Sequence, residues 1–315
     1  RSFRRHSNLM ALILMKQIIV LFLMMGCGLA VVKLGMLKVE DSKALSVVSL
    51  YLLLPSVVIH SFDIEYTPEV MSGFLLALAA ALAFHGILFV ICTVLSSIFH
   101  LGAVEKCSLI YTNAGNIIMP LVAALLGEEW QIYATAFLAV QMTILFSHGQ
   151  SVMEGKPGIN WKKIVTNPNM IAVVAGLVLF LTPLQLPDVL ADTMTSMARA
   201  VGPVSMIMLG MALADIEWKK IFTGKRVYSM VLARMVLLPL VAVFFLRTWG
   251  MMSSVPDSRS ILLVTLLAAI TPTASTIPQM AQLYDQDAAY ASAINVMTTV
   301  VCVVTMPLMV MLYMM

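Results

Sequence analysis

The sequence TNAGNIIMPLVAALLG, from Thr112 to Gly127, is apolar in its second half, but it begins with two asparagines and carries Pro120 near its middle. Proline removes a backbone hydrogen bond and clashes with the carbonyl one turn back, so it tends to interrupt a helix. In hydrocarbon, backbone groups freed in this way need partners from protein, water or a ligand. The stretch therefore predicts a membrane helix that breaks at a binding site.

The rest of the chain is equally apolar. Of its 315 residues, 61% are hydrophobic and only 11% are charged, which is typical of an all-α membrane protein with several spans. A helix crosses a hydrocarbon core of about 30 Å in roughly 20 residues. Apolar windows of this length predict ten spans, near residues 9–34, 43–62, 70–99, 104–126, 131–152, 168–187, 190–214, 225–248, 259–283 and 288–313.

Lysine and arginine are distributed unequally between the two sides of these spans. The more basic side carries Lys33, Lys38, Lys43, Lys106, Lys156, Lys162, Lys163, Lys219, Lys220, Lys225 and Arg226. Because basic loops remain in the cytoplasm, both termini are predicted to lie outside it, in a plasma (cell inner) membrane. Scattered basic residues of this kind do not predict a nucleic-acid partner, and the four cysteines predict neither a disulfide framework nor a metal site.

Two halves of the chain resemble each other. The stretch QIYATAFLAVQMT, from Gln131, matches AAYASAINVMTTV, from Ala288, and the preceding stretches then align Pro120 with Pro278 if one residue is inserted. We therefore expect an N-terminal tail over 1–8, a first five-helix repeat over 9–152, a cytoplasmic linker over 153–167 and a second repeat over 168–315. Since five is odd, the second repeat would enter the membrane in the opposite sense, which makes the repeats inverted.

The paired interruptions predict a substrate site where the fourth and ninth helices cross. Half-helix N-termini carry partial positive charge and free N–H groups, which favour an anion such as a carboxylate. The alternative is that each proline produces a kink or a packing site only. The candidate substrate-binding residues are Asn113, Gly115, Asn116, Pro120, Thr273, Ser275, Thr276 and Pro278.

Supporting residues are expected on neighbouring helices. Tyr51, Pro55 and Ser205 could line the site or could pack within the bundle. Arg234 could offset half-helix C-termini or attract an anion, or it could be a snorkelling or structurally paired arginine. His85 could relay protons, or it could be a hydrogen-bonded core residue. No catalytic residue, cofactor or bound metal is expected, because HExxH, GxSxG and pairs of acidic residues in mid-span are absent from the sequence.

Five stretches in order resemble the auxin efflux carrier family: YLLLPS, TNAGNIIMPLV, NPNMIAVVAGLVL, VGPVSMIMLGMAL and LARMVLLPL. The short central loop is similar to that of the bacterial members more than to the PIN-FORMED carriers of plants. The resemblance implies a ten-helix inverted-repeat fold, similar to that of bile acid sodium symporters. It also implies crossed fourth and ninth helices, with the crossing at Pro120 and Pro278.

The resemblance further implies the function. Family members carry organic anions, including auxin-like acids and dicarboxylates, and many form dimers. We therefore expect a non-enzymatic secondary transporter, an efflux carrier or facilitator, that works by an elevator-like shift. Its transport is either coupled to protons or sodium or proceeds without a coupled ion. A membrane sensor that kept the transporter fold is the alternative. The chain departs from the family's pattern at two positions: Asn116 replaces the small residue that is frequent in the family, and Pro272 adds a second proline to the ninth helix.

Overall fold

The computed structural model describes Lys16 and residues 19–20, 22–156, 161–182, 184, 186–214 and 224–315, and within these ranges the protein is helical. The N-terminal tail over 1–8, the start of the first predicted span, and Lys219 and Lys220 lie outside the described residues. Four helical stretches are long and apolar enough to cross a membrane: Pro68–Phe99, Glu128–Glu154, Lys225–Met252 and Ala288–Met314. Shorter apolar helices accompany them.

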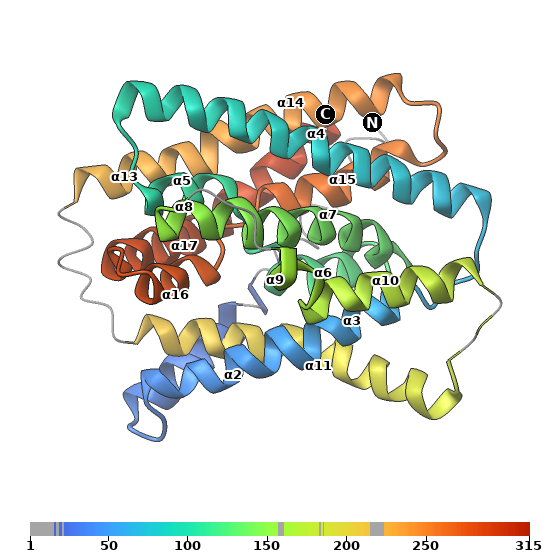
Figure 1. Ribbon diagram of the computed structural model, residues 1–315, viewed down its shortest axis with the longest axis horizontal. Helices are drawn as coiled ribbons and strands as arrows, with labels where there is room; N and C mark the ends of the chain where they lie inside the picture. Colours follow the sequence, from blue (N-terminus) through green and yellow to red (C-terminus); the bar gives the residue numbers. More distant parts are fainter. Residues whose placement is uncertain are drawn as a thin grey trace.

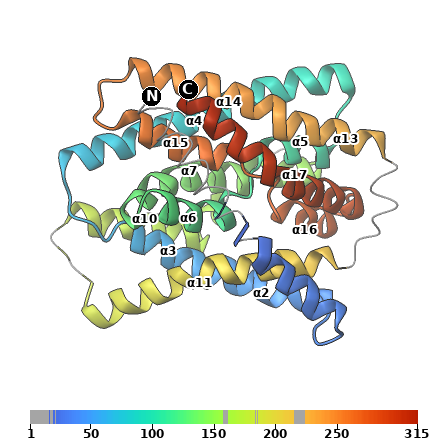
Figure 2. The ribbon, with the colours of Figure 1, turned by 180° about the vertical axis from the view of Figure 1, so that it is seen from behind.

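The helices form two parts that pack against each other. The smaller part contains the helix Phe22–Lys33, α2 (Ser42–Val48), the π-helical turn η2 (Ser49–Leu53), α3 (Leu54–Ser61), α10 (Pro168–Leu181) and α11 (Asp188–Leu213). Figures 1 and 2 show α2, α3 and α11 together along one edge of the molecule. Below, this group is called the scaffold part.

The larger part contains the interrupted helices and is called the crossing part below. It comprises α4 (Pro68–Phe99), α5 (Ala103–Ile110), α6 (Ala114–Leu125), η3 (Glu128–Trp130), α7 (Gln131–Ile144), η4 (Leu145–Gly149), α8 (Gln150–Glu154), α13 (Lys225–Leu232), η5 (Ala233–Leu237), α14 (Leu238–Met252), α15 (Ser258–Ala269), α16 (Thr276–Leu283) and α17 (Ala288–Met314). Its α6 packs against α11 of the scaffold part.

Local sequence signals explain where several helices begin. Asn167 precedes Pro168, and its side-chain oxygen accepts a hydrogen bond from the Asn169 amide at 2.9 Å, as the Asn-Pro pair predicts. Thr67 caps α4 through the amide of Val70, and Asp287 caps α17 through the amide of Tyr290. Short polar side chains thus set the helix starts that follow loops.

Two glycines allow very close packing within the scaffold part. A Cβ atom added at Gly28 would lie 2.0 Å from the carbonyl oxygen of Ile207, and one at Gly210 would lie 1.8 Å from that of Met25. Small residues of this kind let membrane helices approach backbone to backbone. The helix Phe22–Lys33 and α11 are therefore joined by a contact that tolerates no larger side chain.

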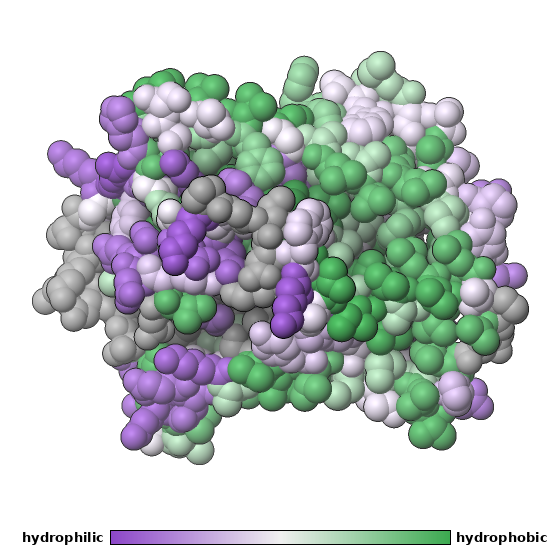
Figure 3. Space-filling model, in the orientation of Figure 1, coloured by the Kyte–Doolittle hydropathy of each residue, from purple (hydrophilic) through white to green (hydrophobic). Residues whose placement is uncertain are grey.

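Hydrophilic residues gather at the ends of the molecule. Figure 3 shows them mainly at the end where α5 and α13 begin, with a smaller group along the opposite edge and a largely hydrophobic surface between the two. The exposed lysines include Lys33, Lys38, Lys43, Lys156 and Lys225. This surface fits a protein whose middle lies in hydrocarbon.

Candidate functional site: a backbone crossing between two interrupted helices

The predicted spans near 104–126 and 259–283 are each divided into two helices, and the two interruptions meet. The first lies between α5 and α6, at residues 111–113, and the second lies between α15 and α16, at residues 270–275. The amide of Asn113 donates to the Pro272 carbonyl at 2.8 Å, and the amide of Ala274 donates to the Tyr111 carbonyl at 3.0 Å. Thr112 and Thr273 thus form an antiparallel β-bridge at the crossing.

The prolines do not lie at this crossing, so the placement of the breaks at Pro120 and Pro278 was wrong. Pro120 is inside α6, and Pro278 is the third residue of α16. A first-turn amide has no partner within its own helix, so a proline there costs no hydrogen bond. Pro120 instead packs toward the scaffold part, where a Cβ on Gly202 of α11 would lie 3.1 Å from its ring.

Side chains from α7 and α17 satisfy the backbone at the crossing. Gln141 accepts from the amide of Thr112 at 3.1 Å and from its hydroxyl at 2.6 Å, and it donates to the Thr112 carbonyl at 2.8 Å. In the other half, the Thr273 amide donates to the Thr298 hydroxyl at 3.3 Å, and Asn295 donates to the Thr273 carbonyl at 2.7 Å. These are the partners that broken helices need in a membrane.

Both predicted asparagines lie beside the crossing in one buried network. Asn116 donates to the side-chain oxygens of Asn113 and Ser275, each at 3.0 Å. Its own side-chain oxygen accepts from Ser205 of α11 at 3.1 Å. Ser205 in turn lies 3.0 Å from the hydroxyl of Ser49 in η2. Asn116 therefore joins both interrupted helices to the scaffold part.

Where α6 and α16 begin, two buried polar side-chain groups lack a partner among the described residues. Among the described residues, the side-chain amide nitrogen (Nδ2) of Asn113 and the hydroxyl of Thr276 are buried and make no hydrogen bond. Asn113 precedes α6 and Thr276 begins α16, so both groups stand at helix N-termini, where partial positive charge and free amides favour negative charge. An anionic group placed between them would accept hydrogen bonds that nothing else there accepts.

Arg234 lies at the opposite helix ends. Its guanidinium donates to the carbonyls of Leu109 at 3.1 Å, Ala269 at 3.0 Å and Thr271 at 2.8 Å, at the C-terminal ends of α5 and α15. The side chain is fully buried, so it does not snorkel to water. It contacts half-helix C-termini, which was one of the arrangements considered from the sequence.

The other supporting residues are not all brought to the crossing. Tyr51 is 54% exposed on the outside of η2, away from the network. Pro55 is half-buried in α3, where a proline in the first turn is tolerated. His85 is buried; it bonds the Ala81 carbonyl of its own helix at 2.8 Å and packs against Phe137. Gly115 is buried in α6 and faces Leu54 of α3.

The polar site residues that were missed from the sequence include Ser49, Gln141, Asn295 and Thr298. A signal for Gln141 was present, because the internal match aligns it with Thr298, and both side chains contact a bridge residue. Polar residues at equivalent positions of two apolar helices indicate equivalent partners. Ser49 and Asn295 have no such signal, because the internal match aligns Asn295 with Leu138 and does not include Ser49.

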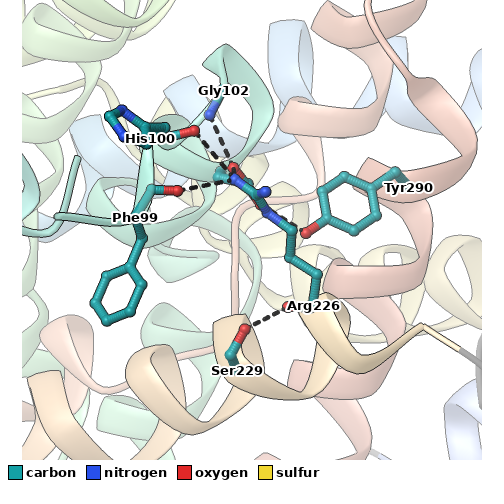
Figure 4. Close-up of polar contacts among 7 residues, drawn as sticks. Phe99, His100, Gly102, Arg226, Ser229 and Tyr290 are labelled. Carbon is teal, nitrogen blue, oxygen red and sulfur yellow. Dashed lines mark hydrogen bonds and ion pairs between the residues drawn. The ribbon is translucent and has the colours of Figure 1, made fainter. Parts of the chain in front are cut away.

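A second polar cluster, centred on the buried Glu105 and the exposed Arg226, joins helices of the crossing part where α5 and α13 begin (Figure 4). Arg226 of α13 pairs with Glu105 of α5 and donates to the carbonyls of Phe99 at 3.3 Å and His100 at 3.1 Å. Tyr290 of α17 donates to Glu105 at 2.8 Å. The cluster ties the half-helix α5 to two helices of the second half of the chain.

A family model described as "Membrane transport protein" matches the chain twice, over residues 13–160 and 157–310. The chain belongs to this family. Membership makes the protein a membrane transporter, in a family that includes auxin efflux carriers, and the matches join within the predicted linker. Each match contains one of the two interrupted helices, so the crossing is assembled from both copies of the family's domain. No curated protein matches the sequence.

Proposed function

We propose that the protein is a secondary transporter, an efflux carrier or facilitator of the auxin efflux carrier type, that moves a small organic anion such as a carboxylate across the plasma membrane. The observation that carries this proposal is the pair of unpartnered donors on Asn113 and Thr276 at the N-termini of α6 and α16. A carboxylate would accept from both groups and would be stabilised by the two helix ends. Asn116 would hold Asn113 and Ser275 in place beside it through its two donated hydrogen bonds.

The proposed architecture has ten spans in two inverted five-helix repeats, with both termini outside the cytoplasm. The double family match, the paired interruptions and the equivalent roles of Gln141 and Thr298 support it. The crossing part would carry the anion past the scaffold part in an elevator-like shift. Dimer formation through the scaffold part is part of the same proposal.

Flux of labelled carboxylates into proteoliposomes tests this function. We expect saturable uptake of at least one mono- or dicarboxylate, lost in protein-free vesicles and reduced by an excess of the unlabelled anion. Proton and sodium gradients are imposed in separate arms to find any coupling. Saturable binding of the same anions without flux would contradict transport and favour a sensor.

An ion-pair cluster between the two parts would resist the elevator movement. Glu128 of η3, in the crossing part, lies 3.6 Å from His60 of α3 and 3.5 Å from Arg199 of α11. His60 also lies 3.3 Å from the hydroxyl of Thr195 in α11. Glu128 is half-exposed and Arg199 mostly exposed, so the pair contributes roughly 0–1 kcal/mol.

Glu128→Gln is therefore expected to speed carboxylate flux by up to about fivefold when departure from this state limits turnover, because the barrier loses at most about 1 kcal/mol. Initial uptake rates in proteoliposomes measure the change. The neighbouring exposed carboxylate gives the control, since Glu129→Gln removes the same charge without touching His60 or Arg199. Equal rates for both variants and the unmodified protein would argue against a contact that must open.

A further inference from the structure

The environment of Arg234 is unusual for a buried arginine. Within the part of the chain that the structure describes, it has no carboxylate partner, and its three hydrogen bonds all go to main-chain carbonyls. Taking an unpaired charge out of water is very costly, so these oxygens must supply the compensating negative potential. They can do so because α5 and α15 end there, and helix C-termini carry about half a negative charge each.

The local backbone holds the side chain in this position. Arg234 lies in the π-helical turn η5, where the amide of Leu238 bonds the carbonyl of Ala233 five residues earlier. Turns of this kind within an α-helix redirect side chains and occur often at functional sites. Pro239 follows directly in α14 and lacks the amide that would continue the regular ladder. The sequence RMVLLP thus places a fixed guanidinium at the crossing.

Converging carbonyls at half-helix C-termini are the ligands with which transporters of the broken-helix type coordinate a coupling cation. Here the Arg234 guanidinium donates hydrogen bonds to these carbonyl oxygens. We propose that the Arg234 guanidinium is a built-in counter-cation that takes the place of a dissolved cation at the C-terminal ends of α5 and α15. It follows that anion transport requires no sodium ion at the crossing.

The arrangement also separates two kinds of charge at the crossing. The cation closes the C-terminal ends, while the N-terminal ends of α6 and α16 keep their unpartnered donors on Asn113 and Thr276. Because the guanidinium is covalently attached, it returns with the crossing part in every cycle and moves no net charge. The anion's own charge would then be the only one transferred, and flux would follow the membrane potential. This last step rests on the proposed function.

Chemical rescue tests the counter-cation without any knowledge of the anion. Purified protein carrying Arg234→Ala is expected to melt at a lower temperature than the unmodified protein, and millimolar guanidinium chloride should restore part of the loss at constant ionic strength. Choline chloride should not restore it. Arg247→Ala, which removes a half-buried arginine bonded to the Leu312 carbonyl at 3.4 Å, is the matched control and should not respond. An unaltered melting temperature of Arg234→Ala, or no response to guanidinium, would overturn the proposal.

A second pair of variants, one with and one without a positive charge, provides the test if Arg234→Ala cannot be purified from membranes. Arg234→Lys keeps a cation and three donors, whereas Arg234→Gln keeps polarity without charge. We expect the lysine variant to be the more stable of the two and to retain carboxylate flux that the glutamine variant loses. Equal stability of the two variants would show that the charge is not needed.

Replacement of sodium by choline in the flux assay tests the second half of the proposal. Carboxylate flux by the unmodified protein should be unchanged, and an inside-positive potential should accelerate anion uptake. A sodium-dependent increase of about tenfold or more, equivalent to 1.4 kcal/mol of coupling, would overturn sodium independence. If no carboxylate is transported at all, the proposed function fails, while the guanidinium rescue still decides the role of Arg234.

Discussion

Gln141→Leu is expected to lower the free energy of unfolding by about 3 kcal/mol, because two buried backbone groups lose their partners at roughly 1–3 kcal/mol each. Gln141 makes three hydrogen bonds to Thr112, and both residues are 1% exposed. Leucine fits the space but neither accepts from the amide nor donates to the carbonyl. Chemical unfolding in detergent micelles, followed by circular dichroism, measures the loss, and flux should fall with it.

Gln131→Leu is the matched control on the same helix. Gln131 is also buried, but it makes one hydrogen bond, to the Met119 carbonyl at 3.1 Å. Its replacement should cost about 1 kcal/mol, the typical contribution of a single hydrogen bond. If both leucine variants lost the same stability, the bridge would not depend on Gln141.

Asn116→Asp should produce the second large effect, a loss of anion affinity of about a hundredfold or more. A carboxylate here would face the bound anion at close range, and two like charges 4 Å apart cost about 4 kcal/mol at an effective dielectric of 20. Asn116→Ala removes two donated bonds and one accepted bond without adding charge, so a smaller loss of about tenfold is expected. Equilibrium binding of a labelled carboxylate at constant pH measures both.

Ser56→Ala gives a control for these binding measurements. Ser56 is buried in the scaffold part, but its hydroxyl bonds the Leu52 carbonyl of its own helical stretch at 2.7 Å. Its removal should leave affinity unchanged. Affinities of the aspartate and alanine variants equal to that of the unmodified protein would move the anion away from Asn116.

Much of the helical arrangement could be predicted from the chain alone. The length of the apolar segments, the helix start at Asn167–Pro168 and the weak match between the two halves can all be read directly from the sequence. None of them depends on which helices pack together. Asn113 and Asn116 were chosen because short polar side chains beside an interrupted membrane helix can bond the freed backbone groups or a ligand. In the structure both lie beside the crossing.

The position of the breaks could not be predicted in the same way. The breaks were expected at the prolines. Pro120 instead lies inside α6, and the interruption begins at Tyr111, where α5 ends. The interruptions are stabilised by side chains from other helices that donate to their main-chain carbonyls, namely Gln141, Asn295 and Arg234. A single-sequence pattern reports local propensity, whereas these partners are brought together only by the packing of distant helices.

The β-bridge between the two interruptions has an evolutionary consequence. Its two hydrogen bonds join main-chain atoms of Asn113 with Pro272 and of Ala274 with Tyr111, so they do not depend on which side chains these positions carry. Mutations can therefore alter the amides and hydroxyls beside the bridge while the junction itself is inherited intact. Such a separation would let descendants of one ancestral carrier acquire new cargo by point substitution, without redesign of the helices that hold it.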